Sequence, residues 1–181
     1  IQLRSDIVFL TATELAQKIR VGELTSLEIV EAHLSQIYVF NPELNSVVTV
    51  NTESALKRAR EADKALAEGK IWGPLHGVPV TIKDHYATKS IRTTSGFYPL
   101  AQYIPNFDAT VVSRLKNAGA IILGKTNMPP IGLDAQTYNP IFGTTNNPWD
   151  LERTPGGSSG GATAATAVGF GPFHLGTDGG G

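Results

Sequence analysis

The sequence predicts an α/β fold in which a central β-sheet is flanked by helices. Three segments within the first 72 residues show the helical spacing of apolar side chains, and from Gly73 onward two β-rich runs are separated by another helical segment. A strand, a helix and a second strand in that order are typical of a crossover connection within one sheet. We therefore expect the N-terminal helices to pack on a sheet that forms later in the chain.

Three helices are expected before the sheet. The first covers about residues 11–21 and opens with a threonine and glutamate pattern that is typical of a helix start. The second begins at Thr25 or Ser26 and should stop before Asn41-Pro42, because the residue before a proline disfavours helical backbone. The third is rich in alanine and covers about 52–68. None carries recognisable chemistry, so all three are interpreted as packing elements.

The expected sheet begins with the run 78–82, followed by a helix over 109–118 and a buried strand over 120–124. The next segment, 126–161, is crowded with Gly, Pro, Asn and Thr and is too long for a simple connector. Long loops on a rigid scaffold often carry functional residues. A helix of small residues over 162–168, able to pack closely on the sheet, completes the pattern.

Composition excludes several classes of function. The chain has 181 residues, 41% of them hydrophobic, and a formal net charge of −1, which predicts a globular protein with a substantial core. The absence of cysteine excludes a disulfide framework, a thiolate zinc site and a cysteine nucleophile. The densest charge run, 57–64, mixes both signs and is interpreted as a solvated helix face, so no nucleic-acid partner is expected. No membrane span or leader is recognised, and a cytoplasmic location is expected.

The Gly/Ser cluster at 155–161 fits more than one interpretation. A phosphate-binding loop would need Gly-Lys followed by Ser or Thr, whereas Ala162 follows this cluster, so that interpretation fails. A Gly-x-Ser-x-Gly nucleophile elbow is matched at both Ser158 and Ser159, but it requires a buried strand immediately before it, and 150–155 is polar and ends in proline. Taken alone, the cluster could equally be a flexible turn that leads into a helix.

The segments around that cluster carry a resemblance. Taken in order they are 73–84, 108–112, 124–128, 143–150, 155–161 and 176–178. Across these six blocks the sequence from Gly73 to Gly181 resembles the amidase signature family of serine-lysine amide hydrolases. The resemblance implies a mixed central sheet flanked by helices. It also implies one incomplete amidase domain over 1–181, in which 1–72 supplies N-terminal helices and 73–181 begins the core.

The resemblance also implies roles for individual residues. Lys83 corresponds to the base and Ser158 to a serine that relays a proton from the nucleophilic serine, which is expected directly after Gly181. A cis peptide bond should lead into Ser158. The backbone N–H groups of Gly179, Gly180 and Gly181 are candidates for binding the oxyanion, since glycine leaves them open to close approach. Ser159 and Asp178 are candidate supporting residues.

Elementary chemistry is consistent with these roles. Lys83 stands at the end of an apolar strand, where desolvation would lower its pKa and allow a neutral amine to act as a base. A hydroxyl both accepts and donates a proton, so Ser158 can connect a base to a nucleophile. None of the four histidines has a partner that the sequence can identify, and we assign them no role.

The expected reaction is therefore the hydrolysis of a small-molecule amide through an acyl-enzyme, without a metal or an organic cofactor. The resemblance leaves open a second activity, that of the A subunit of a tRNA-dependent amidotransferase, although residues 129–139 look more like those of a free-standing amidase. A third interpretation is a non-catalytic polypeptide, because 1–181 does not contain the expected nucleophile. The oligomeric state is open, with a homodimer as one option.

Overall fold

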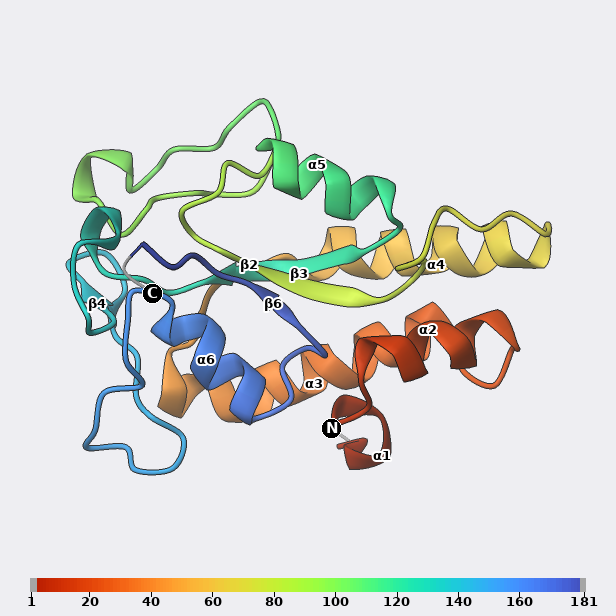
Figure 1. Ribbon diagram of the computed structural model, residues 1–181, viewed down its shortest axis with the longest axis horizontal. Helices are drawn as coiled ribbons and strands as arrows, with labels where there is room; N and C mark the ends of the chain where they lie inside the picture. The colour runs from red at the N-terminus through yellow and green to blue at the C-terminus, as the bar shows by residue number, and fades with distance from the viewer. Residues whose placement is uncertain (1–2, 180–181) are drawn as a thin grey trace.

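A computed structural model describes residues 3–179. Helices flank a central sheet, which confirms the expected α/β class (Figure 1). The helices are α1 (Ser5–Val8), α2 (Ala12–Arg20), α3 (Ser26–Leu44), α4 (Thr52–Ala67), α5 (Thr110–Asn117) and α6 (Gly160–Ala167), with 3₁₀ turns η1 (Tyr98–Leu100) and η2 (Pro130–Gly132). The strands are β1 (Val47–Val50), β2 (Pro79–Lys83), β3 (Ile121–Thr126), β4 (Tyr138–Asn139), β5 (Gly143–Thr144) and β6 (His174–Leu175).

The central sheet has four strands in the order β1-β3-β2-β6. Strand β2 is parallel to both of its neighbours, β3 and β6, whereas β1 runs antiparallel to β3. The sheet is therefore mixed, as the resemblance implied. The connection β2-α5-β3 is the expected crossover, and it leaves the C-terminal ends of β2 and β3 next to each other.

Helices cover both faces of this sheet (Figure 1). On one face, Ala165 of α6 packs in a cluster with Ile121 and Leu123 of β3, and this cluster includes α3 and α4. On the other face, Val112 of α5 packs with Val80 and with other side chains of β2 and β3. Because successive side chains of a strand point to opposite faces, each face receives alternate residues of β2.

A bulge between β2 and β3 changes which side chains share a face. The register shifts between Val80, which pairs with Ile122, and Thr81, which pairs with Gly124, so Leu123 has no partner on β2. Such an extra residue reverses the orientation of the side chains that follow it. The bulge therefore gives Lys125 the same face as its partner Ile82, which is the α5 face.

The expectation that the second helix stops before Asn41-Pro42 is wrong. Helix α3 continues through Pro42 to Leu44. Pro42 lies in the last turn of the helix, so it removes one intrahelical bond, to Tyr38 O, and the helix ends two residues later. The Asn41 side chain also accepts a hydrogen bond from Ser46 N at 2.9 Å, which fixes the chain as it leaves the helix.

The other long elements lie within two residues of their expected bounds, while several short ones were not expected. Strand β1 is a β-branched run of four residues, and β4, β5 and β6 have two residues each. Elements of that length are held by their neighbours in the fold and leave almost no periodic signal in sequence. Within residues 3–179, no helix is long and apolar enough to cross a membrane.

Candidate active site

Lys83 is the last residue of β2, a strand whose five residues are all buried. Its side chain has no exposed surface. It shares the face of Thr81, which contacts His174 of β6, and this is the face that α6 covers. The sheet therefore delivers a long basic side chain to the space between the end of β2 and the start of α6.

The Gly/Ser cluster approaches this space as the turn that enters α6. The peptide bond between Gly157 and Ser158 is cis, as the resemblance implied. Glycines allow the turn to lie against the sheet, because a Cβ on Gly160 would come within 2.2 Å of the Thr137 hydroxyl, and one on Gly161 within 2.4 Å of Asn127 N. The glycine run is thus a packing requirement that places the two serines beside the end of β2.

Three hydroxyl groups surround the amine of Lys83. Its Nζ lies 2.6 Å from Ser158 Oγ, 3.0 Å from Ser159 Oγ and 2.6 Å from Thr177 Oγ1. None of the ion pairs formed by the described residues includes Lys83. The amine is therefore buried among neutral oxygens.

The hydrogen-bonding capacity of these hydroxyls distinguishes their roles. Ser159 Oγ donates to Thr177 O at 3.0 Å and accepts from Thr177 N at 3.1 Å, so its proton is already engaged. A neutral amine donates two hydrogen bonds and accepts one, so one of its three neighbours must donate to it. Ser158 or Thr177 can do so, since within residues 3–179 the Lys83 amine is the hydrogen-bond partner of both hydroxyls.

Burial lowers the pKa of Lys83 from 10.5 to about 8. Desolvation is the cause, because the charged form loses water and gains no carboxylate in return. Lys83 therefore has the protonation behaviour that a general base near neutral pH requires.

Ser158 faces an open groove of about 800 Å³. Residues 132–135 form one wall, and a Cβ on Gly132 would lie 3.7 Å from Ser158 Oγ. Thr177, Asp178 and Gly179 also line the groove. Within residues 3–179, no three His, Asp or Glu side chains gather as metal ligands would.

The structure brings most of the expected site residues together. Lys83, Ser158 and Ser159 are in direct contact, and Asp178 and Gly179 border the same groove. The oxyanion candidates Gly180 and Gly181 lie outside the described residues. Sequence analysis did not identify Thr177 as a contact of the lysine, although it stands in the Gly-Thr-Asp block.

The sequence analysis also did not predict that a second lysine is buried. Lys125, near the end of β3, has no exposed surface and lies 3.5 Å from Asp84 Oδ1, which is buried as well. Its Nζ donates to Tyr86 O at 2.8 Å and to Thr93 Oγ1 at 2.7 Å. Lys125 and Asp84 both stand in the six blocks named above, but their pairing depends on the bulge in β3, which sequence does not reveal.

Comparison with known proteins identifies the family. Residues 28–181 match the sequence profile described as Amidase. The chain is 46% identical over 176 residues to the A subunit of the glutamyl-tRNA(Gln) amidotransferase of Carboxydothermus hydrogenoformans, covering 97% of this chain and 36% of the relative. It is also 46% identical to the corresponding protein of Streptomyces coelicolor, covering 98% and 36%. The chain thus spans about a third of the length of these relatives.

Solved structures agree with that assignment. A fatty acid amide hydrolase superposes with a TM-score of 0.92 at 33% identity, covering 96% of this chain and 31% of that one. A protein described as an amidase superposes with a TM-score of 0.87 at 36% identity, covering 93% and 38%. The profile match extends over most of the chain and includes every residue of the Lys83 cluster. The chain belongs to the amidase family.

Proposed function

We propose that this chain forms part of an amide hydrolase that uses a Ser-Ser-Lys triad, with Lys83 as the base and Ser158 as the relay. The nucleophile is a serine directly after Gly181. The observation that carries the proposal is the 2.6 Å contact between Lys83 Nζ and Ser158 Oγ, made by an amine that is buried without a carboxylate. An amine in that setting loses its proton near neutral pH and can accept one from a hydroxyl.

The reaction begins with two linked proton transfers. Neutral Lys83 takes the proton of Ser158 while Ser158 takes the proton of the nucleophilic serine, whose oxygen attacks the amide carbonyl carbon. N–H groups at Gly179, Gly180 and Gly181 bind the resulting oxyanion. The C–N bond then breaks as Ser158 returns a proton to the leaving nitrogen, and water hydrolyses the acyl-enzyme by the reverse route.

Ser159 and Asp178 act as supporting groups in this proposal. Ser159 holds the Thr177 backbone through two hydrogen bonds, at 3.0 and 3.1 Å, and so fixes the segment that leads to the glycines. Asp178 borders the groove directly before Gly179. Neither group needs to exchange a proton with substrate.

The proposal is tested by labelling the full-length protein with a fluorophosphonate and mapping the adduct by mass spectrometry. We expect one adduct, on the serine that follows Gly181, and a loss of labelling in the variant Lys83→Ala. Labelling of Ser158 itself, or undiminished labelling of Lys83→Ala, would contradict the proposed roles. Arg60→Ala, an exposed change on α4, is the control.

A second candidate is that the full-length protein is the A subunit of a tRNA-dependent amidotransferase. It is favoured by the 46% identity to two proteins of that name, against 33% and 36% for the two solved structures described above. The two candidates share the triad and differ in their substrates. Hydrolysis of simple amides by the purified protein alone supports the free-standing amidase, whereas release of ammonia from glutamine only with partner subunits supports the second candidate.

A further inference from the structure

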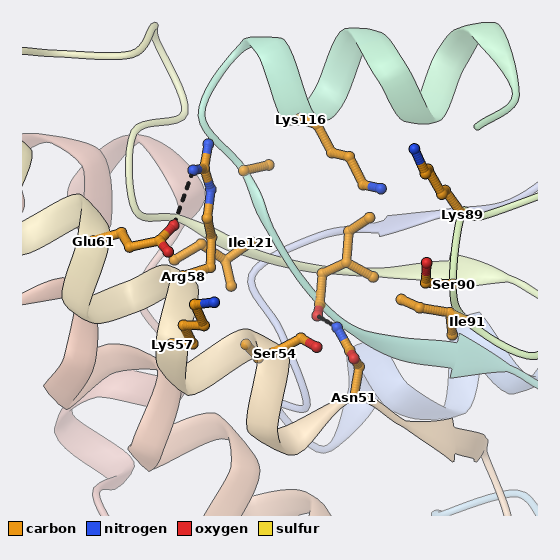
Figure 2. A pocket seen from close by; sticks show the side chains of 13 residues that line it. Asn51, Ser54, Lys57, Arg58, Glu61, Lys89, Ser90, Ile91, Lys116 and Ile121 are labelled. Carbon is orange, nitrogen blue, oxygen red and sulfur yellow. Dashed lines mark hydrogen bonds and ion pairs between the residues drawn. The ribbon is translucent and has the colours of Figure 1, made fainter. Parts of the chain in front are cut away.

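A pocket of about 390 Å³ lies between α4 and α5, over the start of β3 (Figure 2). It has the size of many small-molecule sites, which begin near 300 Å³. It shares no lining residue with the groove at Ser158. Its walls come from three parts of the chain, namely α4, the segment 89–91 that follows β2, and Lys116 of α5, so its shape is set by the tertiary fold.

Four cationic side chains line this pocket, and Figure 2 shows them on opposite sides of it. Lys57 and Arg58 come from α4, Lys89 from the segment after β2 and Lys116 from α5, whereas Glu61 is the one acidic lining residue. The chain as a whole carries a formal net charge of −1. A local excess of positive charge on a slightly acidic protein focuses attraction for anions at this place.

Two of the four cations have a fixed geometry. Arg58 donates to Glu61 Oε2 at 3.2 Å and stacks on the ring of Trp72, with 3.6 Å from the guanidinium carbon to the ring centroid. Lys116 Nζ lies 2.8 Å from both carboxylate oxygens of Asp108.

The other two cations, Lys57 and Lys89, take part in no ion pair within the described part of the chain. Their positive charges are therefore available to bind an anionic ligand. The sequence run 57–64 thus contributes to a pocket rather than only to a solvated face.

The N-terminus of α4 opens on the same pocket. Its N-cap residue, Asn51, makes no side-chain cap, because the amide donates instead to Ile122 O on β3 at 3.0 Å. Helices α2 and α3 begin with complete capping boxes, whereas α1, α5 and α6 also have no side-chain cap. Ser54, in the first turn of α4, lines the pocket. Uncapped N–H groups and the helix dipole therefore add to the attraction that the lysines exert on an anion.

The floor of the pocket is apolar. Ile91, Ile121 and Ile122 line it together with two alanines, Ala55 and Ala120. These side chains belong to the clusters that cover the two faces of β3. Only the edges of these side chains are exposed, since Ile91, Ile121 and Ile122 keep 8%, 1% and 5% of their surface exposed. The apolar body of a ligand would contact these edges together with the methylene stems of the lysines.

We propose that this pocket binds a small organic dianion, a phosphate monoester with an apolar or aromatic body. The phosphate lies at the start of α4, between the walls that carry Lys57 and Lys89, and the apolar body lies over the isoleucines of the floor. A phosphate monoester carries about −1.5 to −2 charges at neutral pH, which matches the two uncompensated lysines. The site is independent of the proposed amide hydrolysis.

The test titrates the full-length protein by isothermal calorimetry, which needs no reporter group in the pocket. Phenyl phosphate is the probe, and inorganic phosphate and phenol, the two parts of this ester, are tested separately. We expect saturable binding of phenyl phosphate, about tenfold or more weaker binding of each part, and a loss of about tenfold in affinity in the double variant Lys57→Glu/Lys89→Glu.

The matched control is Arg60→Glu/Lys64→Glu, which makes the same change in net charge at exposed positions of α4 that do not line the pocket. Its affinity should remain within about twofold of the parent at physiological salt, because these exposed side chains do not line the pocket and salt screens their charge. An equal loss in both double variants would overturn the proposal, since it would indicate attraction by net charge alone. No saturation by phenyl phosphate, or equally tight binding of inorganic phosphate, would overturn it as well.

Discussion

Two lysines end neighbouring strands of the sheet and differ in what surrounds them. Lys83 ends β2 and Lys125 lies one residue before the end of β3, and neither has any exposed surface. Burial lowers the pKa of both amines. Lys83 contacts three neutral hydroxyls, whereas Lys125 lies 3.5 Å from the carboxylate of Asp84. Similar burial therefore produces two different chemical situations.

The difference lies in how each charge is compensated. Asp84 opposes the effect of burial on Lys125, and Thr94 donates to the other oxygen of Asp84 from both its backbone, at 3.0 Å, and its hydroxyl, at 2.5 Å. Such a network favours the ionised pair and fixes the loop after β2. Burial lowers the pKa of each amine to about 8, so the two lysines differ in their neighbours and not in this value. No ion pair of the described residues includes Lys83, and its amine contacts hydroxyls that can give up a proton. We infer that one lysine holds the structure while the other can exchange a proton.

The largest expected effect is the loss of activity in the variant Lys83→Met. It removes the proposed base, and general acid-base catalysis with nucleophile activation supplies about 10²–10⁴-fold or more. The free energy of unfolding should stay within about 1 kcal/mol of the parent, because Met occupies a similar volume and does not suffer the desolvation of a charged amine. Amide turnover and urea unfolding of the full-length protein measure the two quantities. A large loss of stability without a specific loss of turnover would contradict the distinction between the two lysines.

The next largest effect is on stability, in the variant Lys125→Met. Removing one member of a buried ion pair leaves the carboxylate of Asp84 without compensation, at a cost of about 3–5 kcal/mol. The double variant Lys125→Met/Asp84→Leu should recover part of that loss, because a well-packed apolar pair can replace a buried ion pair. Denaturant unfolding measures the coupling in this cycle. If Lys125→Met and the double variant lose equal stability, then Lys125 does not offset the burial of the Asp84 carboxylate.

Some of the contacts in this comparison could be predicted from the sequence, and others depend on how distant segments pair in the fold. Lys83 and Ser158 were identified because they stand within two of the local blocks that carry the resemblance to the amidase signature family, and the structure brings them into contact. The ion pair of Lys125 with Asp84 joins two such blocks through a one-residue bulge that a strand pattern does not display. Thr177 was missed for a similar reason, since its contact with Lys83 requires that β6 pair with β2.

The fold was predictable from the sequence to a similar extent. Long helices and the two buried strands β2 and β3 carry enough periodic residues to be recognised. The strand β6 has only two residues, and it forms by pairing in parallel with Thr81 and Ile82 of β2. The path of α3 through Pro42 depends on the side chain of Asn41, which bonds to the chain beyond the helix. Tertiary contacts of this kind override local preference.

Substitution of the three hydroxyl residues around Lys83 sharpens the assignment of the relay. Ser158→Ala should lower kcat by about 10²–10³-fold, because it removes the proposed path of the proton. Ser159→Ala should lower kcat less, since its proton is already donated to Thr177 O. Thr177→Val discriminates most clearly, because Thr177 Oγ1 is as close to the amine as Ser158 Oγ, at 2.6 Å each. A loss in Thr177→Val as large as that in Ser158→Ala would assign the relay to Thr177.

The smallest expected effect is a pH dependence of activity that follows Lys83 and not Lys125, although burial lowers the pKa of each to about 8. The base must be neutral, and the pKa of Lys83 is lowered to about 8, so log(kcat/KM) should rise with a slope of about 1 up to about pH 8 and level off above it. Lys125→Arg should leave that inflection in place, because Lys125 faces Asp84 on the other side of the sheet. Each pH unit below the inflection removes about tenfold of the neutral amine, so between about pH 6 and 7 the rate constant itself measures the fraction of neutral Lys83. An inflection near pH 10 would show that the lysine remains protonated at neutral pH and would require another base.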